Sequence, residues 1–324
     1  MNQFKTVLLL GLLTGLLVAL GGAMGGRGGM IIALVIAAAM NFFSYWYSDK
    51  IVLKMYRARP VTESEASGVY GMVSELAQNA GLPTPRVYVV DDDTPNAFAT
   101  GRNPENAVVA VTTGILGSLS SRELRGVLGH ELAHIKDRDI LISSVAATLA
   151  GAVMVLASIA RWSMFFGGSS DDDDGGGLGI VGVLAMSILA PIGAMLVQMA
   201  VSRSREYLAD KEGAEMARDP EALASALTRM QEANQRQPMH DAKPQSAHMF
   251  IVNPLSGKSL AGLFSTHPPT EERVARLRQM AGQRNYTGFT PSAHEPRRAM
   301  APPPPPPPQP NSTHRPGRGK IDWS

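Results

Sequence analysis

The sequence predicts a mainly α-helical integral membrane protein with a small antiparallel β-sheet, an α+β fold with about four transmembrane helices. Three observations point to this class. Four apolar stretches have about the length that crosses a bilayer. Two runs of β-branched residues have the length of strands. Helix-capping signals and helical patterns mark the polar segments between and after the apolar stretches.

The first two apolar stretches, residues 7–24 and 30–47, are joined by a glycine-rich turn whose only charged residue is Arg27. They predict a tight transmembrane hairpin. A cleaved signal peptide is the competing interpretation of the first stretch, because Lys5 precedes an apolar run that ends in small residues. The second stretch follows at once, which favours the hairpin.

The other two apolar stretches, residues 140–160 and 178–201, contain no charged residue and predict a second hairpin. The connector between them carries a run of consecutive aspartates. We expect a solvated loop on the outer side of the membrane, with a calcium site as the alternative. The run consists of Asp171, Asp172, Asp173 and Asp174.

Basic residues flank the apolar stretches on the side of the polar segments. Because lysine and arginine collect on the cytoplasmic side, we predict a multi-pass membrane protein with both termini in the cytoplasm. The flanking residues are Lys50, Lys54, Arg57, Arg59, Lys136, Arg138, Arg203 and Arg205.

These signals divide the chain into five parts, in which two membrane hairpins alternate with two cytoplasmic parts and a tail follows. Seven consecutive prolines predict that the tail is extended and disordered. We expect a solvated tether, with an SH3-like partner as the alternative. The parts are residues 1–47, 48–139, 140–201, 202–283 and 284–324.

Composition excludes several classes of function. The formal net charge of +2 gives no support for nucleic-acid binding. The chain has no cysteine, which excludes disulfides, thiol catalysis and cysteine-bound metal. A metal ion must therefore be held by histidine, aspartate or glutamate.

The first cytoplasmic part contains the two strand candidates, residues 86–90 and 107–113, and the region between them is rich in turn residues. We therefore expect the small sheet to be antiparallel. A capping box of Ser120 and Glu123 begins the next helix, which we expect to continue into the third apolar stretch.

Further helices are expected on both sides of the second hairpin. A capping box of Thr62 and Glu65 predicts a helix that runs to about residue 80. Three helices are predicted in the second cytoplasmic part, over residues 202–218, 220–236 and 269–281.

The sequence His-Glu-Leu-Ala-His over residues 130–134 carries the chemistry. It places His130 and His134 one helical turn apart on one face, where both imidazoles can reach one zinc ion. Glu131 lies beside the metal rather than on it, where a carboxylate can take a proton from zinc-bound water. The motif predicts a single Zn²⁺ and a peptide-hydrolysing centre.

A catalytic zinc takes three protein ligands and keeps one position for water. Asp137 and Asp139 follow the motif closely, but on a continuous helix they would have to bend back. We favour Glu206 as the third ligand and Asp210 as the acceptor of an imidazole N–H, because both share one helical face just past the fourth apolar stretch.

The sequence resembles the HtpX-type membrane zinc metallopeptidases, which are zincin-like gluzincins and distant relatives of the CAAX prenyl proteases. Four segments carry the resemblance: residues 94–101, 130–137, 205–210 and 265–273. It implies that His130, His134 and Glu206 bind zinc and that Glu131 is the catalytic base. It also implies proteolytic quality control of misfolded membrane proteins at the cytoplasmic face.

Two further residues in the family-like segments have open roles. Asn96 either lines a cleft in which a substrate backbone adds to a sheet edge, or is an ordinary turn asparagine. His267 either donates to the developing oxyanion, or packs at or caps the helix that follows it.

Two other functions are consistent with the same sequence. One is a membrane scaffold that binds unfolded chains without cleaving them. The other is a processing protease for lipidated C-terminal peptides, which we rank lower because four spans are too few to enclose a large intramembrane chamber. The partners expected in every case are the lipid bilayer and unfolded or membrane proteins.

Overall fold

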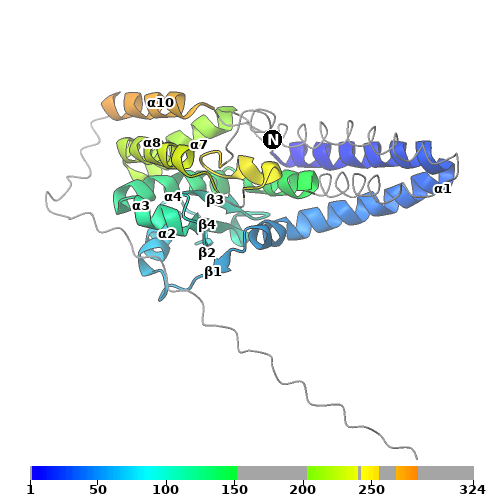
Figure 1. The fold of residues 1–324 in the computed structure, drawn as a ribbon, viewed down its shortest axis with the longest axis horizontal. Helices are drawn as coiled ribbons and strands as arrows, with labels where there is room; N and C mark the ends of the chain where they lie inside the picture. Colours follow the sequence, from blue (N-terminus) through cyan, green and yellow to red (C-terminus); the bar gives the residue numbers. More distant parts are fainter. Residues whose placement is uncertain (1, 152–202, 240–241, 255–267, 284–324) are drawn as a thin grey trace, which may run out of the picture.

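The computed structural model describes residues 2–151, 203–239, 242–254 and 268–283. A long helical hairpin projects from a mixed α/β body (Figure 1). The fourth apolar stretch, most of the third, the aspartate run, His267 and the proline-rich tail lie outside the described residues.

Helix α1, Asn2–Met55, is two helical arms that reverse direction at Gly25 and Gly26. Gly26 has a φ of 55°, which side chains other than glycine rarely adopt. The arms contact each other through Asn41, whose Nδ2 donates to Oγ1 of Thr14 at 2.9 Å. The glycine-rich segment thus forms the turn of a hairpin.

One helix in the described part of the chain, Gly25–Met55, is long and apolar enough to cross a membrane. Two shorter apolar helices, Thr6–Ala19 and Ile140–Gly151, lie beside it (Figure 1). The number of four spans stays a prediction.

The sheet is mixed rather than antiparallel, so this part of the predicted fold class is wrong. Its strand order is β1-β2-β4-β3. Strand β2 runs parallel to β4, whereas β1 pairs with β2 and β3 pairs with β4 in antiparallel fashion. The strands are β1 Arg59–Pro60, β2 Arg86–Val90, β3 Ala97–Thr100 and β4 Val108–Thr112.

The physical reason for the error is β3, which lies in the region expected to be only a turn. Because β3 and β4 form a hairpin, β4 returns in the direction of β2 and inserts between β2 and β3. The hairpin loop contains a short 3₁₀ helix, Pro104–Asn106. Gly101 has a φ of 139° in this loop, and a Cβ there would lie 2.7 Å from the carbonyl oxygen of Asn106.

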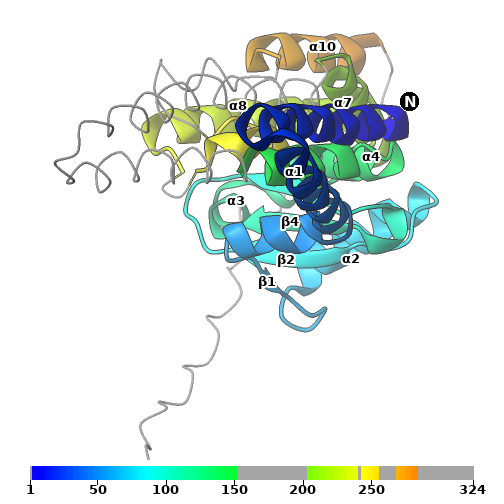
Figure 2. The ribbon, with the colours of Figure 1, turned by 90° about the vertical axis from the view of Figure 1, so that its right-hand side faces the viewer.

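Helix α4 lies at the centre of the body. It packs on β3 and β4 on one side and on α7 and α8 on the other, and α10 covers α8 (Figures 1 and 2). Buried aliphatic side chains of α4, including Val127, Leu128 and Leu132, join these layers into one core. The helices are α2 Ser67–Asn79, α3 Thr113–Ser118, α4 Ser121–Lys136, α7 Arg203–Ala217, α8 Pro220–Arg236, the 3₁₀ helix η2 Pro244–Met249, and α10 Thr270–Gln283.

The two ends of α4 differ in how well the sequence predicted them. The predicted capping box is present, with Ser120 and Glu123 bonded reciprocally. The expected continuation into the third apolar stretch is wrong, because α4 ends at Lys136 and Arg138 has a φ of 57°. This left-handed residue ends the helix, and a new helix begins at Ile140.

The other predicted capping box lies in front of its helix rather than at its start. Glu65 accepts hydrogen bonds from the amide and the hydroxyl of Thr62, both at 2.8 Å. Helix α2 nevertheless begins only at Ser67, so the pair forms a turn before it.

Candidate metal centre

His130 and His134 project from the same face of α4, because four residues make about one helical turn. Their Nε2 atoms lie 3.1 Å apart. His130 is buried, and the side chain of His134 keeps 18% of its surface exposed. Both imidazoles therefore present a nitrogen to one point.

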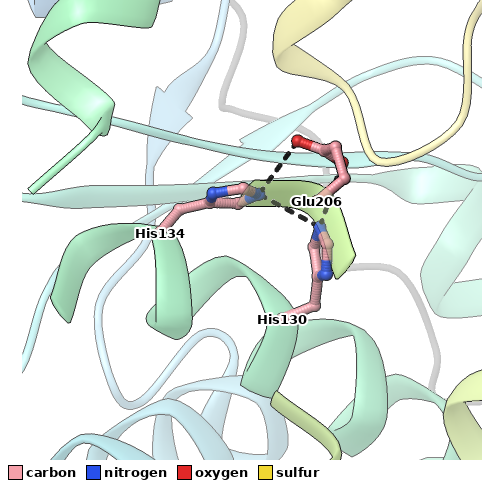
Figure 3. A group of neighbouring side chains, drawn as sticks. All are labelled: His130, His134 and Glu206. Carbon is pink, nitrogen blue, oxygen red and sulfur yellow. Dashed lines mark hydrogen bonds and ion pairs between the residues drawn. The ribbon is translucent and has the colours of Figure 1, made fainter. Parts of the chain in front are cut away.

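Glu206, on α7, directs its carboxylate at the same point (Figure 3). Its Oε1 lies 3.7 Å from Nε2 of His134, and its Oε2 lies 3.9 Å from Nε2 of His130. The three ligand atoms lie within 4.8 Å of one another. The ligands of a tetrahedral zinc lie about 3.3 Å apart, so two imidazoles and a carboxylate at these separations fit a metal ion.

Two glycines bring α7 this close to α4. A Cβ on Gly129 would lie 2.6 Å from the carbonyl oxygen of Gly213, and a Cβ on Gly213 would lie 2.5 Å from the amide nitrogen of His130. No other residue type fits at this crossing. The close contact places Glu206 over the histidines.

Each imidazole has a carboxylate behind it. Oδ1 of Asp210 lies 3.0 Å from Nδ1 of His130. Asp139 lies with its carboxylate oxygens 3.2 and 3.3 Å from Nδ1 of His134. A carboxylate at Nδ1 favours the tautomer that leaves Nε2 free to bind a metal.

Asp210 is itself held by Arg273 of α10. The guanidinium donates two hydrogen bonds to Asp210, at 2.8 and 2.7 Å, and a third to the carbonyl oxygen of Ile251 at 2.7 Å. Burial opposes the charged form of Asp210, but Arg273 outweighs it and lowers the pKa of Asp210 to about 2. Asp210 is therefore ionised at neutral pH.

Glu131 is buried beside the histidines and lines the same cavity of about 30 Å³. Ala99 of β3 lines the same cavity beside it. Burial raises the pKa of Glu131 to about 7, against the attraction of His134. A carboxylate with this pKa can take up and release a proton near neutral pH.

Residues 63–281 match the sequence pattern of peptidase family M48. The "Protease HtpX homolog" of Desulfatibacillum aliphaticivorans is 58% identical over 294 residues, which are 91% of this chain and 94% of the relative. This chain belongs to peptidase family M48. The resemblance to the HtpX-type metallopeptidases is thereby confirmed, and the protein is a membrane metalloendopeptidase.

Other M48 relatives are similar over comparable lengths. The "Protease HtpX homolog" of Persephonella marina is 59% identical, over 87% of this chain and 98% of the relative. That of Pyrococcus furiosus is 56% identical, over 78% of this chain and 87% of the relative. The crystal structure of S. mikatae Ste24p is similar with a TM-score of 0.48 and 18% identity, over 85% of this chain and 65% of that chain.

Not all predicted residues of this M48 peptidase lie at the metal centre. The structure brings together His130, Glu131, His134, Glu206 and Asp210, whereas His267 lies outside the described residues.

The side-chain amide of Asn96 is buried and bonded within the chain. Its Nδ2 donates to the carbonyl oxygen of Val252 at 2.8 Å, and its Oδ1 accepts from the amides of Ala97 and Val252. The amide of Ile251 donates to the carbonyl oxygen of Ala97. Asn96 thus fastens the segment after η2 to β3, through its Oδ1 and one N–H of its Nδ2.

The sequence assigned no role at the metal centre to three residues near the ligands. Asp139 and Arg273 support the histidines as described above. Arg205 lines the metal cavity, and its Nη1 lies 3.8 Å from Asp139. The signal available for Arg205 was its position directly before Glu206. The contact of Arg273 with Asp210 spans 63 residues of sequence, and the signal available for Arg273 was its place in the family-like segment 265–273.

Proposed function

We propose that this M48 peptidase is a zinc endopeptidase that hydrolyses misfolded or damaged membrane proteins at the cytoplasmic face of the plasma (inner) membrane. The observation that carries the chemistry is the convergence of His130, His134 and Glu206, with Glu131 buried beside them. Zinc held by these three ligands would polarise the scissile carbonyl and acidify a water molecule.

The residues of the chain supply the proton transfers. Glu131 would take a proton from the attacking water and return it to the leaving amine, because its carboxylate lies in the same cavity as the ligands without being one of them. Asp210 and Asp139 hold the two imidazoles in the orientation that binds the metal.

The position of the site supports the proposed substrates. The turn after α4 leads directly into the apolar helix Ile140–Gly151, so the metal ligands lie beside a segment suited to the membrane. Basic residues at the end of the α1 hairpin, Lys50 and Lys54, support a cytoplasmic orientation. A peptide that leaves the bilayer on the cytoplasmic side would meet the metal ligands close to the membrane surface.

Cleavage of casein by detergent-purified protein, together with its zinc content, tests the chemistry. Glu131→Gln should keep stoichiometric zinc and lose at least about a hundredfold in cleavage rate, because the general base is gone. Glu206→Ala should lose zinc, whereas Glu212→Ala, on the same helix, should keep it.

Normal cleavage by Glu131→Gln would refute the mechanism, and full zinc content in Glu206→Ala would refute the ligand set. A scaffold that binds without cleaving predicts bound casein and no cleavage in the unaltered protein. The same experiment therefore separates the two functions.

A further inference from the structure

A second cavity, of about 740 Å³, lies where the membrane hairpin joins the body. Both arms of α1, the start of the helix Ile140–Gly151, the β3–β4 loop and Arg138 enclose it. It shares no lining residue with the metal cavity. We propose that this cavity binds an anionic phospholipid, with the phosphate at its arginines and the first part of an acyl chain along its apolar wall.

The apolar wall of the cavity comes from three side chains. Val7 and Leu10 belong to the first arm of α1, and Leu141 begins the helix that follows α4. The outer surface of the hairpin is also apolar, and Val7 keeps 69% of its surface exposed. An acyl chain can therefore lie in the cavity and continue along the hairpin without crossing a polar surface.

Two guanidinium groups also line the cavity. Arg102, on the β3–β4 loop, lies with its Cζ 4.7 Å from the ring centre of Trp46. Arg138 belongs to the turn after α4 and is exposed. Neither forms an ion pair with any residue of the described part of the chain. Against them the lining has one carboxylate, that of Glu105, so the lining keeps a net positive charge.

The rest of the lining fits the boundary between acyl chains and water. Tyr45 and Trp46 lie there, and both residue types concentrate at the level of lipid head groups. Guanidinium groups bind phosphate oxygens with two parallel hydrogen bonds. The lining thus combines guanidinium groups for a phosphate, aromatic rings for the head-group level and aliphatic side chains for an acyl chain.

The inference does not depend on the proposed function, because a lipid can occupy this cavity whether or not the chain cleaves peptides. The arginines could also bind free inorganic phosphate from solution. The apolar wall favours the lipid, since inorganic phosphate gains nothing from Val7, Leu10 and Leu141. The experiment therefore has one arm for each source.

Native mass spectrometry of the full-length protein in a neutral detergent measures the binding. The probes are phosphatidylglycerol, phosphatidylcholine with the same acyl chains, and inorganic phosphate. We expect phosphatidylglycerol to bind at one saturable site, with at least about tenfold preference over phosphatidylcholine. Inorganic phosphate at equal concentration should not displace it.

Three variants locate the site. Arg102→Gln with Arg138→Gln should weaken phosphatidylglycerol binding by about tenfold or more. Leu10→Trp, which keeps both arginines and fills the apolar part, should weaken it as well. Lys50→Gln with Lys54→Gln removes the same charge from the same flank but not from the cavity, and should change it by less than about threefold.

Circular dichroism and thermal unfolding establish that each variant is folded before its binding is compared. Equal binding of both lipids would overturn the proposal. So would an equal loss of phosphatidylglycerol binding in the lysine double variant and the arginine double variant, because either result means general attraction to the detergent surface. Displacement of phosphatidylglycerol by inorganic phosphate would show that the cavity binds a soluble anion and not a lipid. Unchanged binding of phosphatidylglycerol by Leu10→Trp would exclude the cavity as the lipid site.

Discussion

Asp139 orients a metal ligand although it belongs to no helix. Its carboxylate lies 3.2 Å from Nδ1 of His134 and 3.8 Å from Nη1 of Arg205. Removal of such a partner behind an imidazole costs about 10–100-fold in metal affinity. We therefore expect Asp139→Asn to weaken zinc binding by that factor, as measured by competition with a chromogenic chelator.

Asp137→Asn is the matched control, since it removes an equal charge from the same turn, two residues from Asp139. It should change the zinc affinity by less than about threefold, because a partly exposed charge acts weakly over a distance. If the two variants bind zinc equally, Asp139 does not position His134.

For single residues, the sequence predicted the positions that depend only on spacing along one helix. His130 and His134 share a face wherever α4 forms, so the motif alone indicated a metal site. The role of Asp139 depends on where α4 ends, which Arg138 decides through its left-handed backbone. An apolar run that begins at Ile140 gives no warning of that break, so the contact could not be predicted.

The crossing of α4 and α7 decides how far Glu206 is from the histidines. A methyl group on Gly213 would meet the backbone of His130 at 2.5 Å, which forces the helices apart. Gly213→Ala should therefore lower the zinc affinity by about tenfold or more and the free energy of unfolding by roughly 1–3 kcal/mol. Zinc competition and thermal unfolding with and without zinc measure the two effects.

Gly71 of α2 provides the control, because a Cβ there meets no atom within 4 Å. Gly71→Ala should leave zinc affinity unchanged and raise the stability by roughly 0.5–1 kcal/mol. A Gly213→Ala variant with normal zinc affinity would show that the helix separation does not control the site.

Glu123 links the start of α4 to α8. It accepts hydrogen bonds from Ser120 at the cap and from Ser225 at 2.7 Å, and it pairs with Arg229. Burial opposes its charged form, but these hydrogen bonds and Arg229 outweigh it and hold the pKa of Glu123 below its usual range. Its contribution to stability is therefore complete above the ordinary glutamate pKa and is lost as the pH falls below it.

Glu123→Gln should accordingly lower the free energy of unfolding by roughly 1–2 kcal/mol at pH 7. The difference in melting temperature between the two proteins should shrink as the pH falls toward 4. Glu65→Gln, at the exposed turn before α2, is the control and should leave the melting temperature almost unchanged. A difference that persists undiminished in acid would contradict this account of Glu123.

The sheet shows what sequence patterns miss at the scale of elements. Strands β2 and β4 were predicted because their β-branched residues form clear runs. Strand β3, Ala97–Thr100, consists of four buried residues, two of them alanine, between turn residues, and has no strand pattern of its own. Its pairing with β4 was therefore missed, and the direction of β4 relative to β2 was wrong as a result.

For the molecule as a whole, the sequence predicted a hairpin but not how it joins the body. The second arm of α1 continues past the predicted span to Met55, and its last turn buries Val52 and Leu53 in a cluster with β-sheet residues. Tyr56 follows, and its ring lies 5.8 Å from that of Phe98 and 5.0 Å from that of Phe250. Such long-range contacts leave no periodic signal in a sequence.

We therefore expect Tyr56 to contribute most to the packing of the hairpin against the body. Tyr56→Ala leaves a cavity between two aromatic rings and should lower the free energy of unfolding by roughly 3–5 kcal/mol. Tyr56→Phe loses only the 2.6 Å hydrogen bond to Ser246, at a cost of about 1 kcal/mol. Tyr47→Ala, an exposed residue of the same arm, should change the melting temperature in detergent little. Equal loss of stability in all three variants would show instead that the packing of the Tyr56 ring does not decide the stability of this junction.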